Sequence, residues 1–231
     1  MSALAQRFRS PAAAEAERWA RGMQALARDL RLGRLDAAAW QQAVTRFSRT
    51  IAAGDLLAWF DLSRLAARCR SFGPGEHRIA VGLPGRKADP APAAELALLT
   101  AGRAIPPHGH NNLASGHFVL RGTGRVRRYD RIADEPGAVV LQLAGDDPLE
   151  SGACFTGSDF GSNVHWLSAG AASLVLLDLT VAVPGPPGFR HPSGRDGRLY
   201  LDPSGRTDET GLIRAPLLDA PAAVARFGAA P

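Results

Sequence analysis

The hydrophobic period of the chain changes near residues 71–76, and this change limits what the chain can fold into. Before it, apolar residues recur at three- and four-residue steps, as at Trp40, Val44, Phe47 and Ile51, which is the spacing of an amphipathic helix. After it, short β-rich runs alternate with Gly, Pro and Asp, without helical segments between them. The pattern predicts a helical N-terminal region followed by an antiparallel sandwich or barrel.

The predicted organisation has three parts. A helical region covers residues 1–72, a β-barrel covers residues 73–185, and a C-terminal tail covers residues 186–231. The expected strands lie at residues 77–81, 95–101, 117–126, 138–142, 163–168 and 173–183. The tail is expected to carry a short strand over residues 198–201 and a helix over residues 220–227. Asp36 and Asp55 each precede a helical run, so both are predicted N-caps.

Composition is that of an ordinary globular protein, with 45% hydrophobic and 21% charged residues among 231. The longest apolar run, residues 174–183, is interrupted by Asp178 and Thr180 and is shorter than the roughly 20 residues of a membrane span. The first residues lack the apolar stretch of a secretory signal. We therefore expect a cytoplasmic protein without membrane contact.

The formal net charge of +5 comes almost entirely from arginine, with Lys87 as the single lysine. Most arginines are spread along the chain among Asp and Glu, apart from one dense group. That group consists of Arg121, Arg125, Arg127, Arg128 and Arg131. A solvated strand face accounts for it better than a polyanion site, so no nucleic-acid partner is expected. Of the two cysteines, Cys69 falls in an apolar helical pattern, and Cys154 is predicted to be a small buried residue rather than a reactive thiol.

Most common catalytic motifs are missing from the sequence. It has no GxxxxGK[ST] phosphate loop and no GxGxxG between a strand and a helix. It also has no CxxC pair, no HExxH and no GxSxG. These absences remove the sequence support for nucleotide-binding enzymes and for several hydrolase classes.

Histidines are the strongest chemical signal. Three of the six, His108, His110 and His117, fall within ten residues. His108 and His110 are two positions apart, so on an extended strand both rings project from one face. Two imidazoles on one face can grip a metal ion together. The alternative is a polar turn that carries surface histidines.

This stretch resembles the first signature of the cupin superfamily. That signature has a Gly, five further residues, His-x-His, a Glu after three or four more and a later Gly. Gly102, His108, His110 and Gly122 stand at the family's spacing, and Ser115 replaces the Glu. The resemblance implies an antiparallel cupin, or jelly-roll, β-barrel behind the helical region.

A second cupin signature normally supplies another His, preceded by Pro-x-Gly and followed by an Asn. His165 is the candidate here, 55 residues after His110. Phe160, Ser162 and Ala169 stand where the family has the Pro, the Gly and the Asn. The match to the first signature is therefore specific, whereas the match to the second is degenerate, because only its His is kept.

Loss of the Glu leaves a metal site of His108, His110 and His165. Such a site resembles the thiol dioxygenase branch of the cupins, which binds ferrous iron with three His and no carboxylate. The resemblance implies an Fe(II) dioxygenase that acts on a small anionic, thiol-like substrate and O2. The three rings are then expected about 2.0–2.2 Å from one metal. Imidazoles also accept zinc, nickel, manganese and copper.

Two other functions fit the same barrel. One is a lyase, isomerase or hydrolase that uses its metal without oxidation. The other is a module that binds a metal or small ligand without turnover. Cupins often pair through barrel edges, so the resemblance also allows a homodimer.

Four further residues are candidates by position. His117 lies on the same strand face as Ser115, so it is expected to serve as a fourth ligand, a group beside the ligands, a general base or a core residue. Thiol dioxygenases hold the substrate carboxylate with an early-strand Arg, for which Arg78 and Arg103 qualify by position. They also place a Tyr near the iron, and Tyr200 would have to fold back from the tail to do so.

Overall fold

The computed structural model describes residues 11–61, 70–84, 92–159, 161–183 and 197–230. The described helices are α2 (Pro11–Arg31), α3 (Ala37–Ser48), α4 (Ala53–Trp59) and α6 (Ala220–Phe227). The strands are β1 (Arg70–Gly73), β2 (Glu76–Ala80), β3 (Ala93–Leu99), β4 (Ala104–Gly109), β5 (Leu113–Arg121), β6 (Gly124–Glu135), β7 (Ala138–Leu149), β8 (Cys154–Ser158), β9 (Val164–Ala169), β10 (Leu174–Ala182), β11 (Leu199–Leu201) and β12 (Leu212–Leu218).

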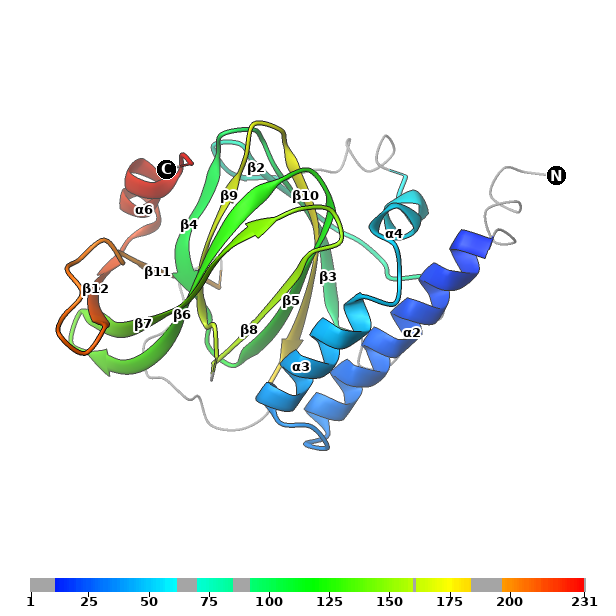
Figure 1. Ribbon diagram of the computed structural model, residues 1–231, viewed down its shortest axis with the longest axis horizontal. Coiled ribbons are helices and arrows are strands. Elements are labelled where there is room, and N and C mark those ends of the chain that lie inside the picture. The colour runs from blue at the N-terminus through cyan, green and yellow to red at the C-terminus, as the bar shows by residue number, and fades with distance from the viewer. Residues whose placement is uncertain (1–10, 62–69, 85–91, 160, 184–196, 231) are drawn as a thin grey trace.

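The strands form two antiparallel layers (Figure 1). One is a six-stranded sheet in the order β1-β2-β3-β10-β5-β8, and the other six strands close into a ring in the order β11-β12-β7-β6-β9-β4. A core of aliphatic side chains and Phe155 fills the space between the layers. The predicted mainly β chain, an antiparallel barrel behind N-terminal helices, is confirmed.

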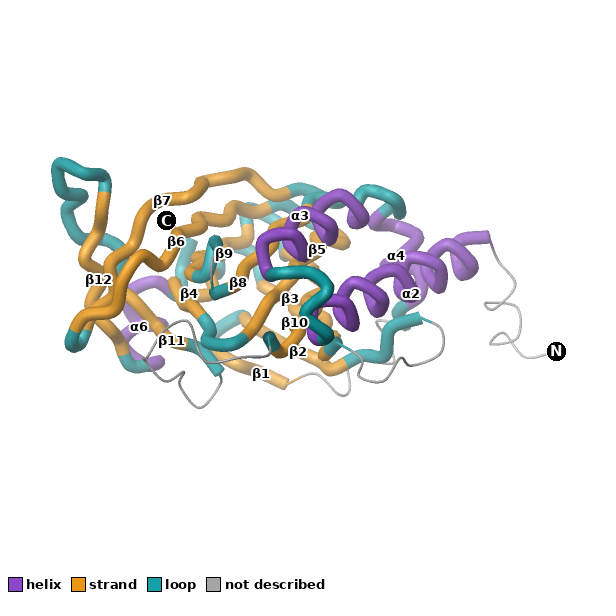
Figure 2. The backbone as a smooth tube through the Cα atoms, turned by 90° about the horizontal axis from the view of Figure 1, so that it is seen from below, coloured by secondary structure: helices purple, strands orange, loops and turns teal. Residues whose placement is uncertain are grey.

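The N-terminal helices cover the outer face of the six-stranded sheet, as Figures 1 and 2 show from two sides. Strand β5 shows how the sequence produces this layer, because its residues alternate between the two faces. Phe118 packs edge-on against Trp19 of α2, with 5.0 Å between ring centroids. Gly116 lets α3 approach closely, since a Cβ there would lie 3.1 Å from Val44 Cγ1. Residues 115, 117 and 119 are left to face the barrel interior.

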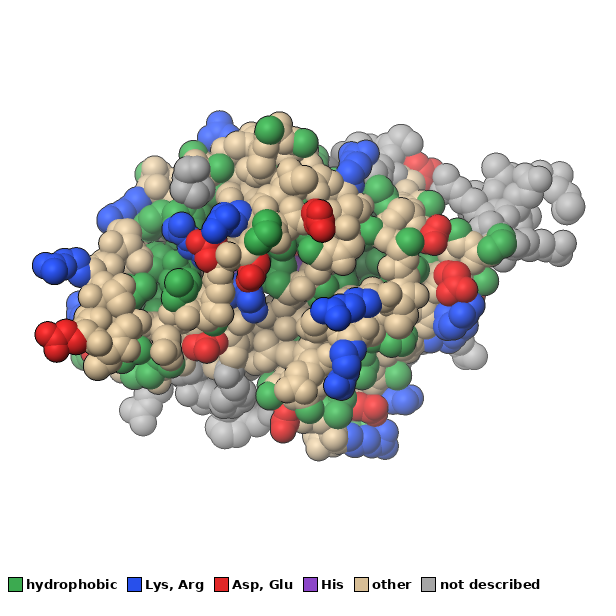
Figure 3. Space-filling model, in the orientation of Figure 1, with side chains coloured by type: hydrophobic (Ala, Val, Ile, Leu, Met, Phe, Trp, Pro, Cys, Tyr) green, Lys and Arg blue, Asp and Glu red, His purple; other side chains and the backbone are tan. Residues whose placement is uncertain are grey.

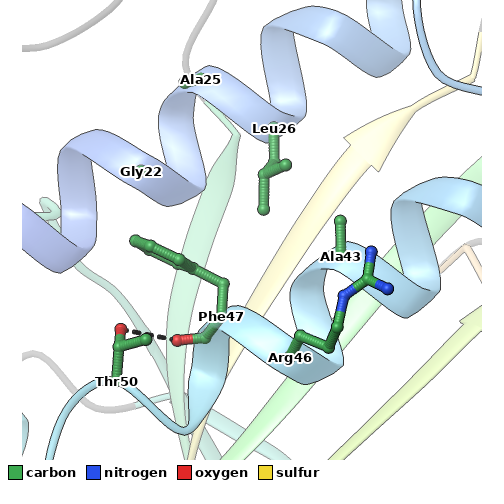
Figure 4. Close-up of a pocket in the computed structure, with 7 residues that line it drawn as sticks. All are labelled: Gly22, Ala25, Leu26, Ala43, Arg46, Phe47 and Thr50. Atoms are coloured by element: carbon green, nitrogen blue, oxygen red, sulfur yellow. Dashed lines mark hydrogen bonds between the residues drawn. The ribbon is translucent and has the colours of Figure 1, made fainter.

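A groove of about 410 Å³ lies between α2 and α3. Figure 4 shows Phe47 and Leu26 lining it from the two helices. Gly22 is required beneath the Phe47 ring, because a Cβ at that position would overlap the ring. The groove belongs to the helical layer, outside the sheet, and is therefore separate from the barrel interior.

Several boundaries differ from the predicted ones. The single strand expected at residues 117–126 is two strands, β5 and β6, because Gly122 turns the chain at a φ of +95°. Strand β1 begins at Arg70, inside the predicted helical region. Of the helix expected from Asp55 to residue 70, α4 is the described part, and residues 62–69, with Cys69, lie outside the described residues. Strands β4, β8 and β12 were not predicted.

One predicted N-cap is correct and the other is wrong. The Asp36 carboxylate accepts a hydrogen bond from the Ala39 backbone N–H at 2.7 Å, which caps α3. Helix α4 begins two residues before Asp55, with Ala52 as its N-cap. The Asp55 N–H bonds back to the Ala52 carbonyl, so Asp55 already lies in the first turn.

Replacing Asp36 with alanine should lower the free energy of unfolding by about 1 kcal/mol, because the α3 N-terminus loses its side-chain acceptor. Urea denaturation followed by circular dichroism measures the change. Asp36→Asn is the matched control, since asparagine caps about as well as aspartate. Equal stability of Asp36→Ala and the wild type would contradict the assignment.

Among the described residues, no helix is both long enough and apolar enough to cross a membrane.

Candidate metal centre

Three histidines meet between the two layers. His108 lies on β4 and is the register partner of His165 on β9, while His110 follows the end of β4. One ring nitrogen from each lies within 4.8 Å of the other two. The structure thus brings together the three residues that the sequence selects as metal ligands, and a small inward movement of the rings would place all three around one ion.

Backbone carbonyls orient two of the rings. The Nδ1 atom of His108 lies 2.8 Å from the Pro106 carbonyl oxygen, and that of His110 lies 2.6 Å from the Gly197 carbonyl oxygen. A carbonyl oxygen only accepts hydrogen bonds, so in each neutral ring Nδ1 carries the hydrogen. Nε2 then keeps its lone pair, which is the usual way in which a protein prepares a histidine for a metal.

Burial keeps the three rings uncharged at neutral pH. It lowers the pKa of His108 and His165 well below the usual value, and the neighbouring histidines lower both pKa values further. Burial also lowers the pKa of His110 to about 4, against the opposing effect of its bond to the Gly197 carbonyl. Neutral imidazoles are the form that binds metal ions, so protons compete weakly for this site.

Strand β4 reaches the site through an irregular register. Its six residues are buried throughout, yet they include Pro106 and Pro107, which have no N–H to donate. The pairing of β4 with β9 shifts between Ile105 and His108, where the prolines lie. A bulge is where a sheet tolerates proline, and pairing resumes at His108.

The C-terminal segment completes this side of the site. Strand β11 pairs with β4 so that Tyr200 lies opposite His108 in the register. The Tyr200 ring centroid is 6.0 Å from that of His108. The C-terminal segment therefore folds back toward the histidines, as a role for Tyr200 in the site requires.

His117 faces the cluster from the six-stranded sheet. Its ring centroid is 5.0 Å from that of His165, and Phe155 stacks on it at 4.4 Å. Its Nδ1 lies 2.8 Å from Asp178 Oδ1, and its Nε2 lies 3.0 Å from Ser115 Oγ. Both ring nitrogens have protein partners, and His117 is not part of the group whose nitrogens converge. This arrangement favours a position beside the three converging histidines over the role of a fourth ligand.

Arg78 belongs to a buried ionic network on the same sheet. Its guanidinium contacts Glu76 Oε1 at 2.8 Å, Asp178 Oδ2 at 2.8 Å and Glu95 Oε2 at 3.2 Å. Burial alone would raise the pKa of Asp178, but attraction to His117 and Arg78 lowers it. Asp178 is therefore ionised and fixed by two partners.

Arg198 joins this network from the C-terminal segment. It donates two hydrogen bonds to the Glu76 carboxylate and a third, of 3.3 Å, to Tyr200 Oη. Sequence reasoning missed Arg198, Glu76 and Asp178 as site residues. The signal for Asp178 was its lone charge within an apolar run. Arg198 is one of several charged residues in a Gly- and Pro-rich stretch, so its position gave no signal.

Arg103 lies away from the histidines. It is exposed, on the turn before β4, and its backbone bridges to Ala229. His108 lies five positions further along the chain, roughly 16 Å at the rise of a β-strand. The structure therefore brings Arg78, and not Arg103, into the surroundings of the site.

The basic group of residues 121–131 lies largely on β6, and three of its arginines pair with acids of β7. Arg125 and Arg127 both contact Asp146, at 2.5 and 2.9 Å, and Arg128 contacts Asp147 at 2.6 Å. Figure 3 shows basic and acidic side chains intermixed over one face of the molecule. The pairings of Arg125, Arg127 and Arg128 fit the expected solvated strand face, whereas Arg131 is buried and pairs with Asp134 of β6.

The thiol of Cys154 should react slowly, because burial raises its pKa to about 11. In a Cys69→Ser variant, alkylation by iodoacetamide at pH 8 should be at least about 100-fold slower than that of glutathione, since the thiolate is scarce. Mass spectrometry of timed samples gives the rate, and unfolding in urea should remove the protection. Alkylation within tenfold of glutathione would contradict the burial.

No family model and no curated protein matches the chain. Among solved structures, KdgF from Halomonas sp. is 17% identical over 51% of this chain and 86% of its own, with a TM-score of 0.37. The vicilin from Solanum melongena is 17% identical over 57% of this chain and 35% of its own, with a TM-score of 0.41. The Cnp3 cupin domain from Schizosaccharomyces pombe is 12% identical over 49% of this chain and 67% of its own, with a TM-score of 0.36. Because these sequence identities and TM-scores are low, the function of the site must be inferred from its own geometry.

Proposed function

We propose that this chain is a metal-dependent cupin in which His108, His110 and His165 hold a ferrous ion. The proposed reaction is the oxidation of a small anionic, thiol-like substrate by O2. The observation that supports it is the set of three uncharged imidazoles, two of them buried and that of His110 partly buried, without a carboxylate among them. Ferrous iron, when bound, would supply adjacent positions for the anion and for O2.

The charges around the site favour an anionic substrate. Three neutral ligands leave the +2 charge of a metal ion uncompensated. The nearby Arg78 and Arg198 are already matched by Glu76 and Asp178 through direct ion pairs. A thiolate or another small anion would therefore supply the missing negative charge, and its binding would be stronger in this water-poor interior than in solution.

The surrounding residues would bind the substrate and exclude water. Tyr200 places a phenol ring beside His108, where its hydroxyl is held near Arg198. Phe155 and His117 form a stacked wall opposite His165. These groups come from both layers of the barrel, so the substrate would lie between the sheets.

Protein purified without oxygen provides the test. The wild type should contain about one equivalent of iron and should consume O2 when small thiols or β-dicarbonyls are added, while His110→Ala should do neither. Arg103→Ala is the control, because Arg103 lies away from the site, and it should retain both properties. Zero O2 uptake by the iron-loaded wild type would contradict the oxidative proposal.

Other outcomes would replace that proposal with a rival. Turnover with zinc, nickel or manganese in the absence of O2 would indicate a lyase, isomerase or hydrolase. Failure to take up any metal after reconstitution would indicate a binding module.

A further inference from the structure

A second set of side chains beside the histidine cluster has the arrangement of a nucleophile, a base and an orienting acid. Ser115 Oγ lies 3.0 Å from His117 Nε2, and His117 Nδ1 lies 2.8 Å from Asp178 Oδ1. Both separations fall within hydrogen-bond reach, which is the geometric requirement for an activated hydroxyl. Such sets are recognised by geometry and roles rather than by their order in a chain.

The hydrogen-bond directions follow from Asp178. Its carboxylate is ionised and can only accept, so Nδ1 of His117 donates to it. In the neutral ring, Nε2 then accepts, and the Ser115 hydroxyl donates its hydrogen to that nitrogen. Arg78 holds the other oxygen of Asp178 at 2.8 Å, which fixes the carboxylate in place. The three groups thus form one directed chain from carboxylate to hydroxyl.

The register of β5 and its neighbours sets this chain in place. Ser115 and His117 are two positions apart on β5, so both face the barrel interior. Asp178 is the register partner of His117 on β10. Gly157 is the partner of Ser115 on β8, and a Cβ there would lie 2.7 Å from the Ser162 carbonyl oxygen and 3.5 Å from Ser115 Oγ. Glycine at this position lets the Ser162 backbone pack against β8 beside Ser115.

We propose that Ser115 is a nucleophile that accepts an acyl group from a small carboxylic ester, with His117 as its base and Asp178 as a positioning residue. The Ser115 oxygen bonds to the ester carbonyl carbon, and its proton passes to His117 Nε2. The carbon–oxygen bond to the alcohol then breaks, and the alkoxide takes that proton. Water releases the acid and restores Ser115. This activity goes beyond the proposed oxidation and does not require the metal.

A fluorophosphonate probe tests the nucleophile without relying on turnover. The full-length chain, both as purified and after treatment with a chelator, is incubated with the probe, and the modified residue is located by mass spectrometry. Ser115 should be labelled in both samples, and Ser115→Ala should remove the label. His117→Gln should slow labelling by at least about 100-fold, the usual scale of base assistance.

Ser158 provides the matched control. It is a buried serine on the neighbouring strand β8, and its hydroxyl bonds to Gln41 instead of a histidine. Ser158→Ala should leave the labelling of Ser115 unchanged, and Ser158 itself should remain unlabelled. A label that spreads over several serines would overturn the proposal.

A second pair of variants separates activation from folding. In Ser115→Cys, the new thiol should react with iodoacetamide at least tenfold faster than in the double variant with His117→Gln, while urea midpoints show that both are folded. Equal thiol rates in the two variants, or an unlabelled Ser115 in folded wild-type protein, would overturn the proposal.

Discussion

Replacing His165 with alanine is expected to lower the affinity for a divalent metal ion by at least about 100-fold. Loss of a group that merely orients a metal-bound histidine already costs about 10–100-fold in affinity. Removal of one of only three ligands should cost more. Competition with a chromophoric chelator, using Zn²⁺ in air and Fe²⁺ without oxygen, measures the effect.

His77→Ala is the matched control for this prediction. His77 lies on β2, outside the group of converging histidines, so its loss should leave metal affinity within about twofold of the wild type. Equal losses in the two variants would show that metal binds nonspecifically to histidines, and the three-histidine site would then be wrong.

Replacing Asp178 with alanine is expected to lower the free energy of unfolding by about 3 kcal/mol. Asp178 is buried and is shared by His117 and Arg78, and removing one member of a buried pair leaves charge without compensation. The loss should lie at the lower end of the usual range, because Arg78 keeps Glu76 and Glu95. Urea denaturation of chelator-treated protein measures the change without any contribution from bound metal.

The exposed pair of Glu135 and Arg214 is the control for Asp178. Its Oε2–Nε distance is 2.6 Å, but both side chains are at least 40% exposed. Glu135→Ala should therefore cost less than about 1 kcal/mol. A loss below about 1 kcal/mol for Asp178→Ala would contradict the interpretation of a buried, stabilising network.

Periodicity was enough to predict the two regions of the fold, because helices and strands repeat their apolar positions differently. It failed where buried strands carry few β-branched residues or contain proline. Strand β4 reads as AIPPHG, which indicates a turn by composition, yet it is buried along its whole length. Only the pairing with β9 and β11 shows that it is a strand.

The three converging histidines were predictable because His108 and His110 lie in a spaced motif and His165 stands at a suitable separation from them. The network around them was not, because it depends on which strands become neighbours. Asp178 meets His117 only through the pairing of β10 with β5. Arg198 reaches Glu76 across 122 residues of sequence. Contacts of this kind arise from topology, which single-residue patterns do not encode.

X-ray absorption spectroscopy of the purified, metal-loaded protein tests the central claim most directly. We predict three imidazole nitrogens about 2.0–2.2 Å from one metal ion, and fewer imidazoles in His110→Ala. A metal with at most one imidazole neighbour, or with sulfur ligands, would contradict the three-histidine centre.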